Sequence, residues 1–432
     1  MKPAISIDFG AAYTKVAIRR QPDTPSELLN HDSLDLDPLH VCIPTIAAWS
    51  ASRDQWVFGA DAADMRSSDD IYVFRNWKKA LFESGDKIFD PESQVGSIFY
   101  QAPAIEGETD PKMKARTVGL KYFHWLKNEL VPSMAGSGGV TEEAIMRICI
   151  PDFALNSLEA SSFDDLLTDA GWKTLSSFCI SEPLANLTGA LSQGRNFMNQ
   201  DDDGEPMPDV SQIFQGSDLI NFINSFDAST MDEEPPSVYS VLIIDVGAYT
   251  ADFGLVAIDL ESLGYFPLCE TNSEPLGISH LDEMVQNRLP DAKKQAIRKL
   301  SSMDLEKMRR SVYSEETAWE HPEVGKIGEA DEAAIVQSCI TELATEIGKS
   351  LDGFLNEHET THIDEVILTG GGNNIPRLVD ELGKQLSGKG AKTFHAANVK
   401  ETIGSARAVP LNAEVVRGAS AIGGASVLFG DI

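Results

Sequence analysis

The sequence reads IDFGAAYTKVAI at residues 7–18 and IDVGAYTADFGL at residues 244–255. In both stretches an apolar run reaches an Asp, and a glycine turn of small residues leads through a Tyr-Thr pair into a second apolar run. Branched apolar residues broken by glycine are typical of a β-hairpin. Because the pattern occurs twice, the sequence predicts a duplicated, two-lobed molecule. Two ordinary hairpins with Asp in their turns are the alternative.

The turns of these two hairpins have the composition of a phosphate site. Small residues let backbone N–H groups approach an anion closely. Asp8 and Asp245 would face the same phosphates and repel them, so the pattern requires a cation such as Mg²⁺, which uses one or two carboxylates and keeps several waters. The residues of the two turns are Gly10, Ala11, Ala12, Tyr13 and Thr14 in the first and Gly247, Ala248, Tyr249 and Thr250 in the second, and their glycines and alanines are the predicted phosphate contacts.

A third motif, EVILTGGGNNIPRLVDEL, occupies residues 365–382. An apolar strand meets three glycines, and Pro376 then opens a helix that carries apolar residues on one face. A strand, a glycine turn and a helix start make an edge suited to contacting a nucleotide, here through Gly371, Gly372 and Asn374. A tight connection without a ligand is the alternative.

Composition and charge limit the class of protein. The 432 residues carry a formal net charge of −32, and 42% of them are hydrophobic, enough for a real core. A fully disordered chain is therefore excluded, and neither nucleic acid nor a membrane is expected as a partner. The five cysteines are scattered without metal-ligand spacing, and no signal peptide or membrane span is evident. We therefore expect a soluble cytoplasmic protein.

With these motifs, the sequence resembles the actin, sugar-kinase and heat-shock-70 ATPase superfamily. It is most similar to the nucleotide-binding domain of DnaK-type chaperones, in a divergent form. The motifs that carry the resemblance are the phosphate loops at 8–13 and 245–252, Ile150-Pro151, Glu182-Pro183, Leu276-Gly277, and residues 306–310 and 412–419.

The resemblance implies a two-lobed actin-like ATPase fold of class α/β, each lobe a duplicated ribonuclease-H-like mixed sheet with flanking helices. The implied divisions are lobe I at 1–193 with a subdomain near 40–125, an acidic insertion at 194–237, lobe II at 238–404 with an adenine helix near 300–314, and a closing segment at 405–432 that returns to lobe I.

The resemblance also implies a site for ATP or ADP with Mg²⁺. The implied roles are Asp8 and Asp245 as organisers of the hydrated metal, Glu182 and Asp252 as residues that order the attacking water, Thr14 and Thr250 as phosphate contacts, Gly277 as the turn after the second phosphate loop, and Glu306, Arg309, Arg310 and Tyr313 at the adenine end.

The function that the resemblance implies is that of a slow ATPase acting as a nucleotide-driven conformational switch or chaperone-like factor. The chain ends where the chaperones' interdomain linker would begin, so no peptide-binding domain is expected. A protein client or co-chaperone is the expected partner, and we expect a monomer or weak oligomer.

The sequence departs from the family at the position of its lysine. Residues 58–64 contain none, and Arg66, Lys78 and Lys79 are candidates to replace it. A lysine beside the transferred phosphate stabilises developing charge, so its absence affects the expected hydrolysis rate more than ATP binding.

A second departure lies in the adenine pocket, where Tyr313 and Asn374 replace a Ser and an Arg of the family. These departures keep several alternatives open. They are an actin-like filament or partition ATPase, a nucleotide-binding pseudoenzyme, and a small-molecule kinase.

Overall fold

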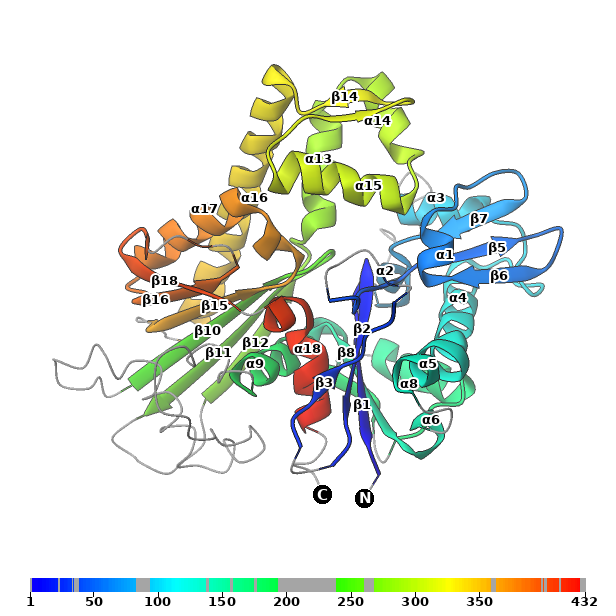
Figure 1. The fold of residues 1–432 in the computed structure, drawn as a ribbon, viewed down its shortest axis with the longest axis horizontal. Helices are drawn as coiled ribbons and strands as arrows, with labels where there is room; N and C mark the ends of the chain where they lie inside the picture. Colours follow the sequence, from blue (N-terminus) through cyan, green and yellow to red (C-terminus); the bar gives the residue numbers. More distant parts are fainter. Residues whose placement is uncertain are drawn as a thin grey trace.

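The computed structural model describes residues 2–21, 24–32, 34, 39–82, 94–136, 140–155, 158–174, 177–192, 238–259, 268–358, 363–397, 399, 402–411 and 413–427. The described chain is mixed α/β, with two large sheets and helices around and between them (Figure 1). The acidic insertion predicted at 194–237 lies outside the described residues.

The first sheet has six strands and begins with the first predicted hairpin. β1 pairs antiparallel with β2 and parallel with β8, which pairs parallel with β9. The hairpin therefore leads into a parallel region, which makes the sheet mixed. Its strands are β1 (Ala4–Phe9), β2 (Tyr13–Arg19), β3 (Glu27–Leu28), β4 (Ile43–Pro44), β8 (Ile145–Ile150) and β9 (Cys179–Ser181).

The second sheet has seven strands and repeats this arrangement. β10 pairs antiparallel with β11 and parallel with β15. In spatial order its strands are β12 (Leu268–Glu274), β11 (Ala251–Asp259), β10 (Val238–Val246), β15 (Glu365–Thr369), β16 (Thr393–Ala396), β18 (Ala406–Pro410) and β17 (Thr402–Ile403).

The prediction of two matched hairpins is confirmed, and their registers correspond. Asp8 of β1 faces Lys15 of β2, and Asp245 of β10 faces Asp252 of β11. Each Asp is the next-to-last residue of its strand, beside the turn. The equivalent cross-strand partners differ in charge, which matters for the site below.

Two helices, α9 (Glu182–Ser192) and α18 (Ala413–Val427), pack on each other between the two sheets (Figure 1). Their backbones approach closely because each presents glycine at the contact. A Cβ at Gly189 would collide with the carbonyl of Ala419, and one at Gly423 with that of Ala185. The closing segment is expected to begin at residue 405 and to return to lobe I. Within it, β18 belongs to the second sheet, and α18 packs against the first sheet.

Further helices and a small sheet surround the first hairpin. Buried aromatic rings fill the space between them, and Phe9 packs against Trp77, Phe123 and Phe163. This core anchors the hairpin directly beside Asp8. The elements are β5 (Ala47–Ser50), β6 (Gln55–Phe58), α1 (Gly59–Ala63), β7 (Ile71–Phe74), α2 (Trp77–Phe82), α3 (Gln94–Gln101), α4 (Pro111–Trp125), the π-helical turn Leu126–Leu130, α5 (Val131–Met134), α6 (Val140–Glu143), α7 (Asp152–Leu155) and α8 (Leu158–Asp169).

The elements around the second hairpin include the helix predicted near 300–314, where α15 and the π-helical turn that follows it are found. Pro376 opens α17 as predicted, because a proline at the first helical position needs no N–H partner. The elements are α13 (Ile278–Arg288), α14 (Asp291–Arg298), α15 (Ser302–Arg309) with its π-helical turn Arg310–Ser314, β13 (Trp319–His321), β14 (Gly325–Ile327), α16 (Ala330–Glu357), the 3-10 turn Gly371–Asn374 and α17 (Pro376–Ser387).

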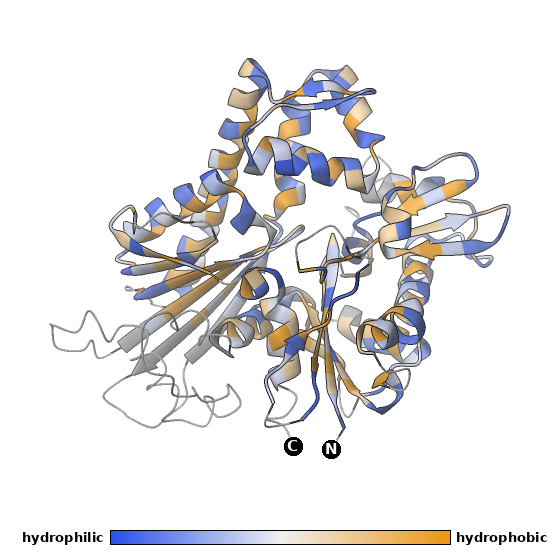
Figure 2. Ribbon diagram, viewed as in Figure 1, coloured by the Kyte–Doolittle hydropathy of each residue, from blue (hydrophilic) through white to orange (hydrophobic). Residues whose placement is uncertain are grey.

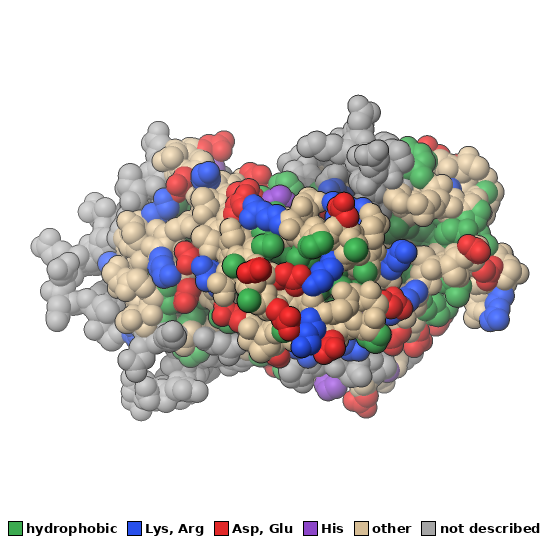
Figure 3. Space-filling view, turned by 90° about the horizontal axis from the view of Figure 1, so that it is seen from above, with side chains coloured by type: hydrophobic (Ala, Val, Ile, Leu, Met, Phe, Trp, Pro, Cys, Tyr) green, Lys and Arg blue, Asp and Glu red, His purple; other side chains and the backbone are tan. Residues whose placement is uncertain are grey.

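The strands of both sheets carry much of the buried apolar core, and polar residues are frequent on the outer helices (Figure 2). Seen from above, acidic and basic side chains are interspersed rather than gathered into a patch of one sign (Figure 3). Within the described residues, no helix is both long enough and apolar enough to cross a membrane.

Candidate functional site

A cavity of about 700 Å³ opens where the two hairpin turns meet. Its size is within the range of sites for small molecules and cofactors. The start of α9, the end of α15 and the glycine turn before α17 complete its wall. The predicted residues that line it are Asp8, Gly10, Ala11, Ala12, Tyr13, Glu182, Asp245, Gly247, Ala248, Tyr249, Thr250, Glu306, Arg309, Arg310, Tyr313, Gly371 and Asn374.

Thr14, expected to contact phosphate, does not line this cavity. Its side chain is buried, bonds the hydroxyl of Thr45 at 2.9 Å and accepts from the hydroxyl of Tyr122 at 3.1 Å. Alternation along β2 turns Thr14 inward while its neighbour Lys15 reaches the cavity. Thr14 therefore supports the first hairpin from inside the core.

Gly277 and Gly372 also lie behind the cavity wall. The N–H of Gly277 donates to the carbonyl of Tyr249 at 3.0 Å, which fixes the start of α13 against the second turn. Gly372 is buried against Val246, where a Cβ would collide with that side chain. Both glycines allow close packing of backbone beneath the site.

Asp8 forms an ion pair with Lys15, whose Nζ lies 2.8 Å from the carboxylate. Burial lowers the pKa of Lys15, but the charge and hydrogen bond of Asp8, together with Cys42 and Asp245, raise the pKa overall. The ammonium is therefore held charged in the cavity wall. Lys15 is a site residue that the motifs do not identify, although its cross-strand spacing from Asp8 in a hairpin is a signal that could have found it.

Glu182 forms a second buried ion pair, with Lys78 at 2.9 Å. Lys78 also lies 5.7 Å from the centroid of the Phe9 ring, so it is fixed in the wall of the cavity. Burial raises the pKa of Glu182, with Lys78 opposing the shift and Asp8 adding to it.

Among the three candidates for the missing family lysine, Lys78 is the one that lines the cavity. Arg66 instead pairs with Asp304 and Glu323 at the surface. The Nζ of Lys79 lies 5.2 Å from the centroid of the Tyr249 ring. Position thus distinguishes three residues that the sequence leaves equivalent.

Asp245 is held by α9 and the glycine turn. Asn186 donates to its carboxylate and also bonds Ser420 of α18. Gly370 adopts a positive φ of 80° beside it, and a Cβ there would collide with the Asp245 carboxylate and the backbone of Val246. Glycine is required at this position because an L side chain is strained there and has no space.

Burial raises the pKa of Asp245 to about 7. Lys15 and Lys78 oppose this shift, and the carboxylates of Asp8 and Glu182 add to it. At this end of the cavity three carboxylates share the wall with two ammonium groups, which leaves an excess of negative charge when all are ionised.

Asp252, predicted to order water, lies just behind Thr250. It accepts from the Thr250 hydroxyl at 2.8 Å and from the hydroxyl of Ser273. Burial raises its pKa, and Glu182 and Asp245 raise it further. In this structure Asp252 therefore orients Thr250, which lines the cavity.

At the end of the cavity that the resemblance assigns to adenine, two of the predicted residues share one buried partner. The Nε of Arg309 donates to Asp282 at 3.0 Å, and the hydroxyl of Tyr313 donates to the same carboxylate at 3.0 Å. Burial lowers the pKa of Arg309, but Asp282, with Glu306 and Tyr13, raises the pKa overall. Arg309 is therefore a planar guanidinium whose positive charge is balanced by Asp282. Asp282 is a site residue that the motifs do not identify.

The donor set fits a hydrated divalent cation. Asp8 and Asp245 line the same cavity, and the excess of carboxylates around them favours a positive ion. Across the described ranges, no group of three or more His, Cys, Asp or Glu side chains forms a direct ligand cluster. A cation held through water by few carboxylates, as Mg²⁺ is, suits this arrangement.

No model of a known protein family matches the sequence, and a search of curated proteins finds no match either. The resemblance therefore depends on the motifs and on the geometry described above.

Proposed function

We propose that this chain is a heat-shock-70-like ATP-binding protein and a slow Mg²⁺-dependent ATPase that acts as a nucleotide-driven switch. The proposal includes a two-lobed actin-like fold, each lobe a ribonuclease-H-like mixed sheet. The observation that carries it is one cavity lined by both matched turns, with Lys15 and Lys78 paired to Asp8 and Glu182 in its wall.

Binding would use the two turns for the phosphates and the end of α15 for the base. The small residues of the turns present backbone N–H groups, and the two lysines offset phosphate charge. Arg309, held flat by Asp282, offers a face on which an adenine ring can stack. Asp8 and Asp245 would hold Mg²⁺, which when bound neutralises phosphate charge.

Hydrolysis would depend on Glu182 and Lys78. The raised pKa of Glu182 makes its carboxylate a better proton acceptor than an ordinary one, which suits a residue that orients and deprotonates water. Lys78 offsets the charge that develops on the phosphate. Lys78 and Glu182 form an ion pair with each other in this structure. To act on the water and on the phosphate, the two side chains would have to separate or to contact the ligand while still paired. We therefore expect slow turnover.

The switch would be closure of the two halves around nucleotide, since the cavity is walled by residues from both. A protein client or co-chaperone is the proposed reader of that change. We place the activity in the cytoplasm because Cys149, Cys179 and Cys339 are buried thiols outside any disulfide, as in a reducing compartment.

The test is calorimetric titration of ATP and ADP with Mg²⁺, with phosphate release followed on the same sample. We expect binding and slow release in the wild type. Glu182→Gln should slow release while sparing ATP affinity. Lys78→Gln should slow release by about 10²-fold. Lys127→Gln is the matched control, since Lys127 pairs with Glu142 away from the cavity.

The outcomes separate the alternatives. Binding without any release indicates a nucleotide-binding pseudoenzyme, and absence of binding rejects the proposal. ATP-dependent light scattering that rises with protein concentration indicates an actin-like filament instead.

A further inference from the structure

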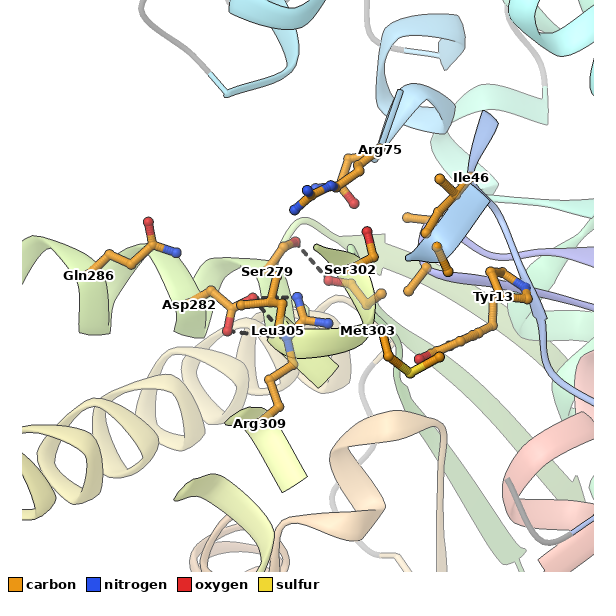
Figure 4. A pocket seen from close by; sticks show the side chains of 16 residues that line it. Tyr13, Ile46, Arg75, Ser279, Asp282, Gln286, Ser302, Met303, Leu305 and Arg309 are labelled. Carbon is orange, nitrogen blue, oxygen red and sulfur yellow. Dashed lines mark hydrogen bonds and ion pairs between the residues drawn. The ribbon is translucent and has the colours of Figure 1, made fainter. Parts of the chain in front are cut away.

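A second, smaller pocket of about 60 Å³ adjoins the main cavity. It lies between the chain that follows β7 and the helices α13 and α15, and it shares Tyr13 and Arg309 with the main cavity (Figure 4). One buried water needs about 10–15 Å³, so this pocket has room for a few waters or for one small polyatomic ion.

Arg75 is the cation of this pocket. Its guanidinium donates to the backbone carbonyl of Leu300, and within the described chain no carboxylate lies at ion-pair distance from it. Burial and the repulsion of Arg309 and Arg66 lower the pKa of Arg75 to about 10. A partly buried guanidinium near two others, bonded to a neutral carbonyl, is an incompletely compensated positive charge.

Ser302 supplies a second unsatisfied group in the same pocket. Its hydroxyl oxygen is shielded from solvent and has no hydrogen-bond partner in the described part of the protein. Such a group costs free energy unless something accepts its proton. Ser302 is also the first residue of α15, where backbone N–H groups lack partners within the helix.

The acidic residue of the pocket lining does not cancel this positive character. Asp282 is occupied by Arg309 and by the hydroxyl of Tyr313. Figure 4 shows Asp282 beside Arg309 on the α13 side of the pocket, whereas Arg75 enters from the opposite side. An anion placed near Arg75 would therefore meet donors first and a neutralised carboxylate behind them.

We propose that this pocket binds a phosphate-sized oxyanion between Arg75 and Ser302. The guanidinium would donate to the anion in a charge-assisted hydrogen bond, and the serine hydroxyl would gain its missing acceptor. The anion is either free inorganic phosphate or an anionic group of a ligand that extends from the main cavity. The inference does not depend on ATP binding, because it rests on the pocket alone.

The test is calorimetric titration of the nucleotide-free full chain with inorganic phosphate. Arg75→Gln should weaken phosphate binding about tenfold or more, since a charge-assisted bond is lost. Ser302→Ala should weaken it severalfold without lowering thermal stability, because the hydroxyl has no partner to lose. Arg116→Gln is the control, a surface arginine that pairs with Asp169 away from this pocket and whose loss should leave phosphate binding unchanged.

Repeating the titration with saturating ADP distinguishes the source of the anion. Phosphate that still binds, and still depends on Arg75, is a free ion. If ADP displaces it and Arg75→Gln also weakens ADP, the group belongs to a nucleotide. The proposal is overturned if the wild type binds no phosphate, if Arg75→Gln and Ser302→Ala bind phosphate as the wild type does, or if Arg116→Gln weakens phosphate binding equally.

Discussion

The two hairpins have the same antiparallel register at their aspartates, but the residue across from the aspartate differs in charge. In the first, Asp8 faces Lys15 and forms an ion pair at 2.8 Å. In the second, Asp245 faces Asp252, so two carboxyl groups meet at the equivalent position. The first hairpin therefore balances its own carboxylate, whereas the second depends on charge from elsewhere. One cross-strand residue is enough to make a duplicated scaffold asymmetric.

The largest expected effect of this asymmetry is on stability against pH. The pKa of Asp245 is raised from 3.8 to about 7, so the folded state holds this proton more tightly than the unfolded state. The contribution to stability is fully present below about pH 4 and is lost as the pH rises through 7. It is on the order of 4 kcal/mol.

Urea unfolding of nucleotide-free protein between pH 4 and pH 8 measures this loss. Asp245→Asn has no such proton and should flatten the curve relative to wild type. Added Mg²⁺ should also reduce the loss, since a cation favours the ionised carboxylate. Parallel curves for wild type and variant would show that Asp245 does not titrate in this range.

The next effect is on nucleotide binding when the first hairpin is made to resemble the second. Lys15→Gln leaves Asp8 without its partner and adds to the negative charge that faces Asp245. ATP affinity should fall on the order of 100-fold, because phosphate would meet uncompensated carboxylates. Calorimetry measures the change, and Lys15→Arg should retain most of the affinity. Equal affinities for Lys15→Gln and the wild type would refute the role of this pair.

A smaller effect should follow from removing the like charge in the second hairpin. The Asp252→Asn substitution preserves the side-chain volume and leaves an oxygen that can accept from the Thr250 hydroxyl. It removes a second buried carboxylate whose pKa is raised. Stability should then fall less between pH 4 and pH 8 than in the wild type. Turnover should drop about tenfold while ATP affinity is kept if Asp252 helps to order the attacking water, as the resemblance implies. A change in affinity alone would assign Asp252 to binding.

Local patterns are enough to predict the elements that form the site. The alternation and glycine turns predict both hairpins, and Pro376 predicts the start of α17, because each depends on neighbouring residues. The pairing of Lys78 with Glu182, and of Arg309 with Asp282, joins residues distant in the chain. No local pattern contains such contacts, so the sequence leaves their charges unassigned.

The threonines that follow the two turns show the same limit of local patterns. The sequence predicts both as phosphate contacts, yet Thr14 bonds Thr45 and Tyr122 inside the core, whereas Thr250 lines the cavity. Alternation along β2 directs Thr14 away from the cavity and Lys15 towards it. Position within the strand, not residue type, decides which threonine can contact a ligand.

The smallest effect in this comparison is therefore expected at Thr14. Thr14→Val should cost about 1 kcal/mol of stability and leave ATP affinity unchanged, because the hydroxyl bonds only groups in the core. Thr250→Val, the matched change, should lower ATP affinity and turnover. Denaturant unfolding and calorimetry on both variants give the comparison. An affinity loss in Thr14→Val at unchanged stability would restore Thr14 to the site, and the two hairpins would then be equivalent in function despite their different charges.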